Sequence, residues 1–273
     1  MSGWRLRLKQ APALRLDLRE LSLAAEDIER VRVGHGNALV PLAEFFDVAP
    51  DADGRLLLEG GEGLARCDRI GWGMKQGALI VDGPAGHYAG ACMSGGTLHI
   101  HGSAGLLAAC EMSGGALTID GDAGDFAAST LPGSMDGMRG GTLIVKGSAG
   151  ARFGDRMRRG TALVFGDAGD FLASRMVAGT IAVAGAVGVH PGYGMRRGSL
   201  VLLQAPARLP ATFVPAGAEA PVFWQLLARE LARHGGVFGG PFAELPSRRI
   251  ERHLGDLAAD GRGELILVSQ PKT

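Results

Sequence analysis

The segment Met-Ser-Gly-Gly-Thr-Leu-His-Ile-His-Gly-Ser-Ala-Gly, residues 93–105, contains a pattern that returns every 19 residues. The pattern is Met-x-x-Gly, a short apolar run and then Gly-x-Ala-Gly, and one step, from Met112 to Met138, spans 26 residues. The methionines in phase, each followed three residues later by a glycine, are Met74 with Gly77, Met93 with Gly96, Met112 with Gly115, Met138 with Gly141, Met157 with Gly160, Met176 with Gly179 and Met195 with Gly198. A chain that keeps this phase is a repeat protein, and its repeat has to be read before local propensity.

Apolar residues two positions apart stand in fixed columns of the repeat, as Leu98 and Ile100 do in one copy. Spacing of two, with many β-branched residues, predicts a strand that buries one face. Glycines this dense would destabilise a helix. One strand per 19 residues predicts an all-β fold, a right-handed parallel β-helix whose turns stack at about 4.8 Å, so that like columns lie over one another. Tyr88, Phe126 and Phe171 then predict an aromatic ladder at one corner.

The sequence divides into three predicted parts. Residues 1–54 lie outside the repeat and form an N-terminal cap, because the first turn would otherwise expose unpaired backbone groups. A short helix with Ser22 as its N-cap is expected within this cap. Residues 55–205 form the β-helix repeat domain. Residues 206–273 form a linker, helices and a final strand, a small α/β extension.

Helical and strand patterns alternate in this C-terminal part. A helix is expected from Val222 to His234, and Gly235 and Gly236 follow it as a stop signal. A second, partly helical stretch is expected from Arg248 to Ala259, followed by a strand from Glu264. The apolar face of the first helix is predicted to hold Val222, Phe223, Leu226, Leu227 and Leu231.

The outward column just before the Gly-x-Ala-Gly glycine changes character along the chain. It begins polar, with Asp82, His101, Asp120 and Lys146, and becomes apolar at Phe165, Ala184 and Leu203. Apolar side chains do not usually line an exposed face together. We therefore expect the late turns to be covered, either by the C-terminal helix or by a partner protein.

The long step of the repeat contains seven additional residues, Leu131 to Gly137. Such a segment must bulge from one corner of the stack, because repeat proteins accept insertions in surface loops. Two interpretations stay open. The loop either contacts a partner or is a neutral excursion.

Basic residues follow the methionine in several turns, and they suggest a ridge. Arg139 and Arg158 belong to successive turns, so a regular stack would bring them about 5 Å apart. Stacked like charges repel unless an anion or an acidic partner lies between them. The ridge either binds an anionic carrier or an acidic partner protein, or consists of solvated arginines at a corner. Its candidate residues are Arg139, Arg158, Arg159, Arg196 and Arg197, with Lys75 in an earlier turn.

Composition excludes several classes of protein. The 28 basic and 28 acidic residues balance, which does not favour a general nucleic-acid or membrane binder. No apolar run is long enough for a membrane span, and the N-terminal residues lack the apolar core of a signal peptide. The odd set of Cys67, Cys92 and Cys110 argues against a disulfide framework. A cytoplasmic protein with structural thiols is expected.

Catalytic patterns are not found in the sequence. His99 and His101 project from the same side of one expected strand, as two metal ligands would. No third ligand is expected in their columns, where Thr118 and Asp120 follow, and no Cys-x-x-Cys pair is present. A dinucleotide-binding Gly-x-Gly-x-x-Gly at a strand-to-helix junction and a Gly-x-Ser-x-Gly elbow are also missing. The sequence therefore assigns no catalytic and no metal-binding residue.

The repeat resembles a known family. As in Met93 to Gly105 and Met138 to Gly150, it is similar to the GXGXG-type β-helix of the C-terminal domain of the glutamate synthase large subunit. It also resembles the C-subunit of formylmethanofuran dehydrogenase and its bacterial relative in the formyltransferase/hydrolase complex. The segments that favour this C-subunit over glutamate synthase are Leu16-Asp-Leu, Gly36-Asn, Phe45-Phe-Asp-Val and Arg252-His-Leu-Gly-Asp-Leu-Ala-Ala-Asp-Gly-Arg-Gly-Glu-Leu-Ile-Leu.

The resemblance implies a non-catalytic scaffold subunit in one-carbon metabolism. The complex would pass the formyl group of formyl-tetrahydromethanopterin to a methanofuran-type carrier and hydrolyse it to formate. Implied partners are a formyltransferase subunit, a metal-dependent amidohydrolase-type subunit that holds the metal, and a third large subunit. The composition favours a bacterial, methylotroph complex. The alternatives are the C-subunit of a molybdenum or tungsten formylmethanofuran dehydrogenase and a glutamate-synthase-like structural domain. The ridge is compatible with a carrier that has an acidic polyglutamate tail.

Overall fold

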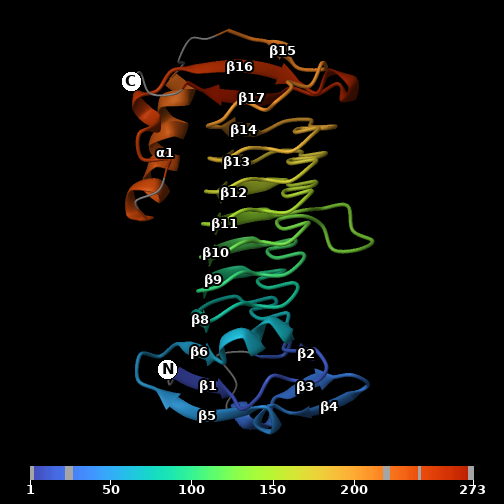
Figure 1. Ribbon diagram of the computed structural model, residues 1–273, viewed down its shortest axis with the longest axis vertical. Coiled ribbons are helices and arrows are strands. Elements are labelled where there is room, and N and C mark those ends of the chain that lie inside the picture. The colour runs from blue at the N-terminus through green and yellow to red at the C-terminus, as the bar shows by residue number, and fades with distance from the viewer. Residues whose placement is uncertain (1–2, 22–26, 218–221, 239–240, 270–273) are drawn as a thin grey trace.

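The protein is a long stack of strands with one helix along its side, as the computed structural model in Figure 1 shows. The structure describes residues 3–21, 27–217, 222–238 and 241–269. Within these residues the chain is mostly β, so the predicted fold class is confirmed at that level. The expected helix at Ser22 lies outside the described residues.

The repeat builds the middle of a 13-stranded sheet in which each turn adds one parallel strand. Leu117 has Leu98 and Leu143 as its partners on the two neighbouring strands, and all three are buried. Like columns therefore stack on one side, as the 19-residue period predicts. The strands of this region are β6 (Leu56–Glu59), β8 (Ala78–Asp82), β9 (Ser94–Ile100), β10 (Ser113–Ile119), β11 (Arg139–Val145), β12 (Arg159–Val164), β13 (Thr180–Val183) and β14 (Ser199–Leu202).

The second half of the pattern forms a separate ladder. Its alanines make single parallel bridges from turn to turn, beginning with Ala85 to Ala104 and ending with Ala168 to Val187. Both edges of each turn are thus hydrogen-bonded to the next turn, with leucine, alanine and methionine side chains packed between them.

The Met-x-x-Gly phrase has a steric explanation. At Gly141, φ is +81°, and an added Cβ would lie 2.7 Å from the Gly115 carbonyl oxygen and 2.7 Å from Met112 Cε. Glycine is required where φ is positive and another backbone approaches this closely. The terminal methyl group of the buried methionine in one turn therefore packs against the glycine of the next turn, where a side chain would displace it.

Strands from outside the repeat extend the sheet at both ends. β1 (Gly3–Leu8) pairs in parallel with β6, and β5 (Phe46–Asp51) pairs antiparallel with β1. At the other end β17 (Gly263–Val268) adds in parallel to β14, followed by antiparallel β16 (Ile250–Gly255) and β15 (Val214–Pro215). A small second sheet consists of β2 (Leu16–Asp17), β3 (Arg32–His35), β4 (Ala38–Pro41) and β7 (Cys67–Asp68).

The C-terminal predictions need two corrections. Helix α1 runs Val222–Phe238, past the predicted stop at Gly235 and Gly236. The stretch expected to be partly helical from Arg248 to Ala259 is mainly strand β16, because it pairs along its whole length with β17. A single 3-10 turn, Leu257–Ala259, remains helical, and the final strand is where it was expected.

Helix α1 covers the outer face of the late strands, beside β11 to β14 in Figure 1. Trp224 and Leu231 are buried, whereas Val222 and Leu226 are 77% and 62% exposed. The predicted covering by the helix is confirmed, but the predicted apolar face is wrong by part of a turn, since Trp224, Ala228 and Leu231 face the sheet. No described helix is long and apolar enough to cross a membrane.

Candidate functional site

The predicted basic ridge is irregular at its centre. The partner of Arg139 in the ladder is Arg159, and the register shifts between Arg139 and Thr142. The Arg158 amide donates to the Met138 carbonyl at 2.8 Å, so Arg158 still lies beside the Arg139 peptide, and its spacing of about 5 Å from Arg139 stays a prediction. The register shift lies at Gly140 and Gly141 within β11, and a fixed 19-residue count does not reveal it.

Acidic side chains of the same chain accompany part of the ridge. Arg139 lies 3.8 Å from a Glu111 carboxylate oxygen, and Arg158 forms an ion pair with Asp136 of the insertion. By contrast Arg159, Arg196 and Arg197 are exposed and, among the described residues, form no ion pair. The ridge thus has a neutralised part beside the insertion and a positively charged part with Arg159, Arg196 and Arg197.

The insertion leaves one corner of the stack as an open loop, visible beside β10 and β11 in Figure 1. Its ends are fixed: the Leu131 amide donates to Glu111 Oε1 at 3.3 Å, and the Gly137 amide donates to the Arg156 carbonyl at 3.0 Å. Met135 near the tip is 62% exposed. A contact with a partner and a neutral excursion both stay open.

The predicted aromatic ladder is interrupted. Between Phe126 and Phe171 the column holds Arg152, whose guanidinium carbon is 6.0 Å from the first ring centroid and 4.8 Å from the second. Tyr88 and Phe126 are separated by Leu107 in the same way, and all these residues have φ near +60°. The corner is therefore an alternating column of aromatic and other side chains with favourable cation–π geometry.

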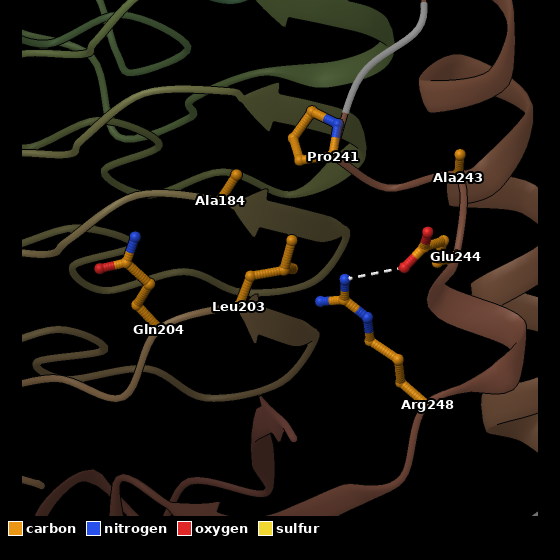
Figure 2. A pocket seen from close by; sticks show the side chains of 7 residues that line it. All are labelled: Ala184, Leu203, Gln204, Pro241, Ala243, Glu244 and Arg248. Carbon is orange, nitrogen blue, oxygen red and sulfur yellow. Dashed lines mark hydrogen bonds and ion pairs between the residues drawn. The ribbon is translucent and has the colours of Figure 1, made fainter. Parts of the chain in front are cut away.

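Two pockets lie near the C-terminal end of the stack. The first, about 330 Å³, lies between the outer face and the segment after α1, and Figure 2 shows its lining. Its charged residues, Arg248 and Glu244, pair at 3.2 Å. The second, about 560 Å³, has mainly apolar walls, and its buried carboxylate, Asp256, accepts hydrogen bonds from the Gly194 and Ala258 amides. In both pockets these charged groups are therefore paired with other groups of the chain and hold the neighbouring segments together.

A cluster that was not predicted as a site lies on the outer face of the early turns. His99, His101 and Asp120 each offer a ligand atom within 4.8 Å of the others. His99 Nε2 lies 3.0 Å from Asp120 Oδ1, and Lys146 Nζ lies 2.8 Å from the same oxygen. A carboxylate that could serve as a third ligand therefore lies beside the two histidines, and the prediction of no metal site stays a prediction. Asp120 is 19 residues after His101 and directly above it, a signal that the repeat itself contains.

The thiols match structural roles. Burial raises the pKa of Cys67 and of Cys110 to about 12 and also raises the pKa of Cys92. A thiol with a raised pKa is a poor nucleophile at neutral pH, because the thiolate is the reactive form.

Comparisons with known proteins agree with this architecture. The model of the GXGXG motif family matches residues 74–213, about half of the chain. The C-subunit of molybdenum-containing formylmethanofuran dehydrogenase 1 from Methanothermobacter thermautotrophicus is 38% identical over 79 residues, 28% of this chain. The match spans only 19% of that curated relative.

A solved structure matches over far more of the chain. It is the crystal structure of the formyltransferase/hydrolase complex (FhcABCD) from Methylorubrum extorquens with methylofuran. One of its chains is 40% identical with a TM-score of 0.88, and the match covers 97% of this chain and 100% of that one. This chain therefore belongs to the GXGXG motif family, and it is similar to the C-subunit of formylmethanofuran dehydrogenase and to one chain of the formyltransferase/hydrolase complex.

Proposed function

We propose that this chain is a non-catalytic scaffold subunit of a formyltransferase/hydrolase complex. The complex takes the formyl group of formyl-tetrahydromethanopterin through a methanofuran-type carrier to formate. The observation that carries the proposal is the match over the whole length of one chain of such a complex, at 40% identity. Formyltransferase, metal-dependent amidohydrolase-type and third large subunits are the proposed partners in a hetero-oligomer.

The fold suits a scaffold. We infer that the repeat is a right-handed parallel β-helix, supported by the parallel order of β6 to β14 and by the second ladder of alanine bridges. The predicted parts 1–54, 55–205 and 206–273 remain the proposed organisation of cap, repeat and extension. A long stack held by backbone bonds on two sides is rigid and offers extended surfaces for other subunits.

The chemistry of the described residues also supports a non-catalytic role. The thiols have raised pKa values. In the two pockets, Arg248 and Glu244 pair with each other, and Asp256 is hydrogen-bonded to backbone amides. A cytoplasmic location remains a prediction.

The ridge is the proposed contact with an acidic partner or carrier. Arg196 and Arg197 are adjacent and exposed near the end of the stack, and Arg159 is exposed two turns earlier. Arginine side chains bind carboxylates through bidentate hydrogen bonds, which suits a polyglutamate tail or an acidic protein face.

Two alternatives belong to the same family. The C-subunit of a molybdenum or tungsten formylmethanofuran dehydrogenase is favoured by the 38% identical segment. A glutamate-synthase-like structural domain shares the repeat, but no specific observation on this chain favours it. The partner subunits distinguish all three, since each complex contains different enzymes.

The test is co-purification from the native host. The tagged chain is expected to retain formyltransferase and amidohydrolase-type subunits in stoichiometric amounts, identified by mass spectrometry. Recovery of molybdenum or tungsten subunits would favour the dehydrogenase, and recovery of the chain without other subunits would contradict the proposal.

A charge reversal tests the ridge separately. Arg196→Glu with Arg197→Glu should weaken assembly or the binding of an acidic polyglutamate peptide. Arg229→Glu, an exposed change on helix α1, is the matched control and should have no effect. If the Arg196 and Arg197 reversals assemble and bind the peptide as well as the Arg229→Glu control, these arginines are solvated side chains without a binding role.

A further inference from the structure

The outer face of the early turns carries the three-residue cluster of His99, His101 and Asp120, which has no role in the proposed function. His99 and His101 are two residues apart, on β9 and just after it, so both point outward on the same side. Asp120 follows β10 and is the next-turn counterpart of His101, as the pairing of Ile119 with Ile100 requires. The repeat therefore brings two imidazoles and a carboxylate together from adjacent turns.

The distances suit one metal ion. In a four-coordinate zinc site with bonds of about 2.0–2.2 Å, neighbouring ligand atoms lie roughly 3.3 Å apart. His99 Nε2 and Asp120 Oδ1 are 3.0 Å apart, and the three ligand atoms lie within 4.8 Å of one another. The two imidazole rings have centroids 4.5 Å apart. Small side-chain rotations would bring all three ligands to bonding distance.

The backbone under the cluster is fixed. The His101 amide donates to the Val81 carbonyl at 2.9 Å, and the Asp120 amide donates to the Ile100 carbonyl at 2.9 Å. The side chains thus rise from neighbouring rungs of one ladder. His101 is exposed, so the solvent side of the cluster is open.

We propose that His99, His101 and Asp120 bind Zn²⁺ or a similar divalent transition ion, with a fourth position open to water or to another ligand. Two imidazoles and one carboxylate form a ligand set that zinc accepts, and three protein ligands leave one position free. The nearest competitor is Lys146, whose ammonium lies 2.8 Å from Asp120 Oδ1. Zinc replaces that ammonium as the positive partner of the carboxylate.

Zinc titration of the 273-residue chain, with a chromophoric chelator as competitor, tests the proposal. One equivalent should bind, and His101→Ala should weaken binding at least about tenfold, because even the loss of an outer-shell partner has an effect of that size. His190→Ala is the control and should bind as the unmodified chain does, since His190 stacks on Phe171 at another corner.

A gain-of-affinity variant sharpens the test. Lys146→Met removes the competing ammonium and should tighten zinc binding, whereas adventitious binding to histidine would not respond. Unchanged affinity in Lys146→Met, unchanged affinity in His101→Ala or no stoichiometric binding would each overturn the proposal. Cobalt absorption in the visible range gives a second readout that needs no variant. The titration measures zinc bound by this chain alone, and the scaffold test measures which subunits co-purify with it. A negative result in one experiment therefore does not affect the other proposal.

Discussion

The outer face of the long sheet differs between its early and late turns, while the inner face stays the same. On β8 to β10 the outer side chains are half-buried or exposed and include His99, Thr118 and Asp120. On β11 to β14 the outer position in the middle of each strand is apolar and buried in one cluster with residues of α1, as Leu163 and Val201 are. Inside, leucine or another apolar residue continues through both regions. Stacking therefore fixes the inner columns, whereas the outer columns depend on what lies beside them.

The largest expected effect separates the inner from the outer column in the early turns. Leu117→Asp places a carboxylate among buried leucines and should lower the free energy of unfolding by about 5 kcal/mol or more. Thr118→Asp, one residue further on the outer side, should cost about 1 kcal/mol or less. Urea denaturation measures both, and equal losses would mean that the two faces are misassigned.

The next effect concerns the covered late turns. Trp224 is fully buried against the sheet, and its indole nitrogen donates to the Arg248 carbonyl at 3.2 Å. Trp224→Ala should cost about 4 kcal/mol and increase hydrogen exchange in β12 to β14. The neighbouring change Phe223→Ala removes a ring that is 43% exposed and should cost far less. Similar losses would show that α1 does not pack as described.

A third test asks whether glycine is required in these columns because a side chain would collide with the neighbouring turn. Gly141 and Gly133 have φ of +81° and +85°, but only Gly141 has backbone within 4 Å of an added Cβ. Gly141→Ala should cost about 3 kcal/mol, the sum of backbone strain and overpacking. Gly133→Ala should cost about 1 kcal/mol, from strain alone. Thermal unfolding with known enthalpy gives both values, and their difference isolates the contact between turns.

The smallest expected effect concerns pH on the uncovered face. Burial alone would raise the pKa of Asp120, but its contacts with Lys146 and His99 outweigh burial and lower that pKa. The stabilisation is then complete above the unfolded pKa of about 3.9 and is lost as pH falls through the lower folded pKa.

The difference in urea midpoint between the unmodified chain and Asp120→Asn should therefore be present at about pH 6 and shrink as the pH falls below about 3.9. The measurement needs a chelator, so that metal does not contribute. Lys146→Met should reduce the difference, because it removes one of the two partners. A difference that stays constant across this range would contradict the assignment.

The same comparison shows where sequence reasoning succeeds. Columns such as Leu98 and Leu117 can be predicted because their neighbours are set by a constant period. The covering of Leu203 can be predicted because an apolar outer column needs a cover. By contrast, the ladder partner of Arg139 cannot be predicted from the period, because a register shift in β11 changes the residue spacing between the two strands.

Non-local pairing explains the other failures. The residues of β16 carry a local pattern that predicts a partly helical stretch, yet they form a strand because β17 offers them an edge that no local pattern reveals. The period does place Asp120 above His101, but a carboxylate is also ordinary in an outward polar column. The distances between the three side chains, which the period does not give, are what suggest a metal site there. Which outer residues meet a partner depends on surfaces that this chain does not contain.

The scaffold function proposed above means that this chain holds catalytic subunits together and does not itself turn over substrate. Formate release from a formylated methanofuran-type carrier, measured with the purified chain alone and with the co-purified complex, tests it most directly. We expect release by the complex and none above the buffer background by the chain alone. Release by the chain alone, undiminished after removal of trace partner subunits, would contradict it.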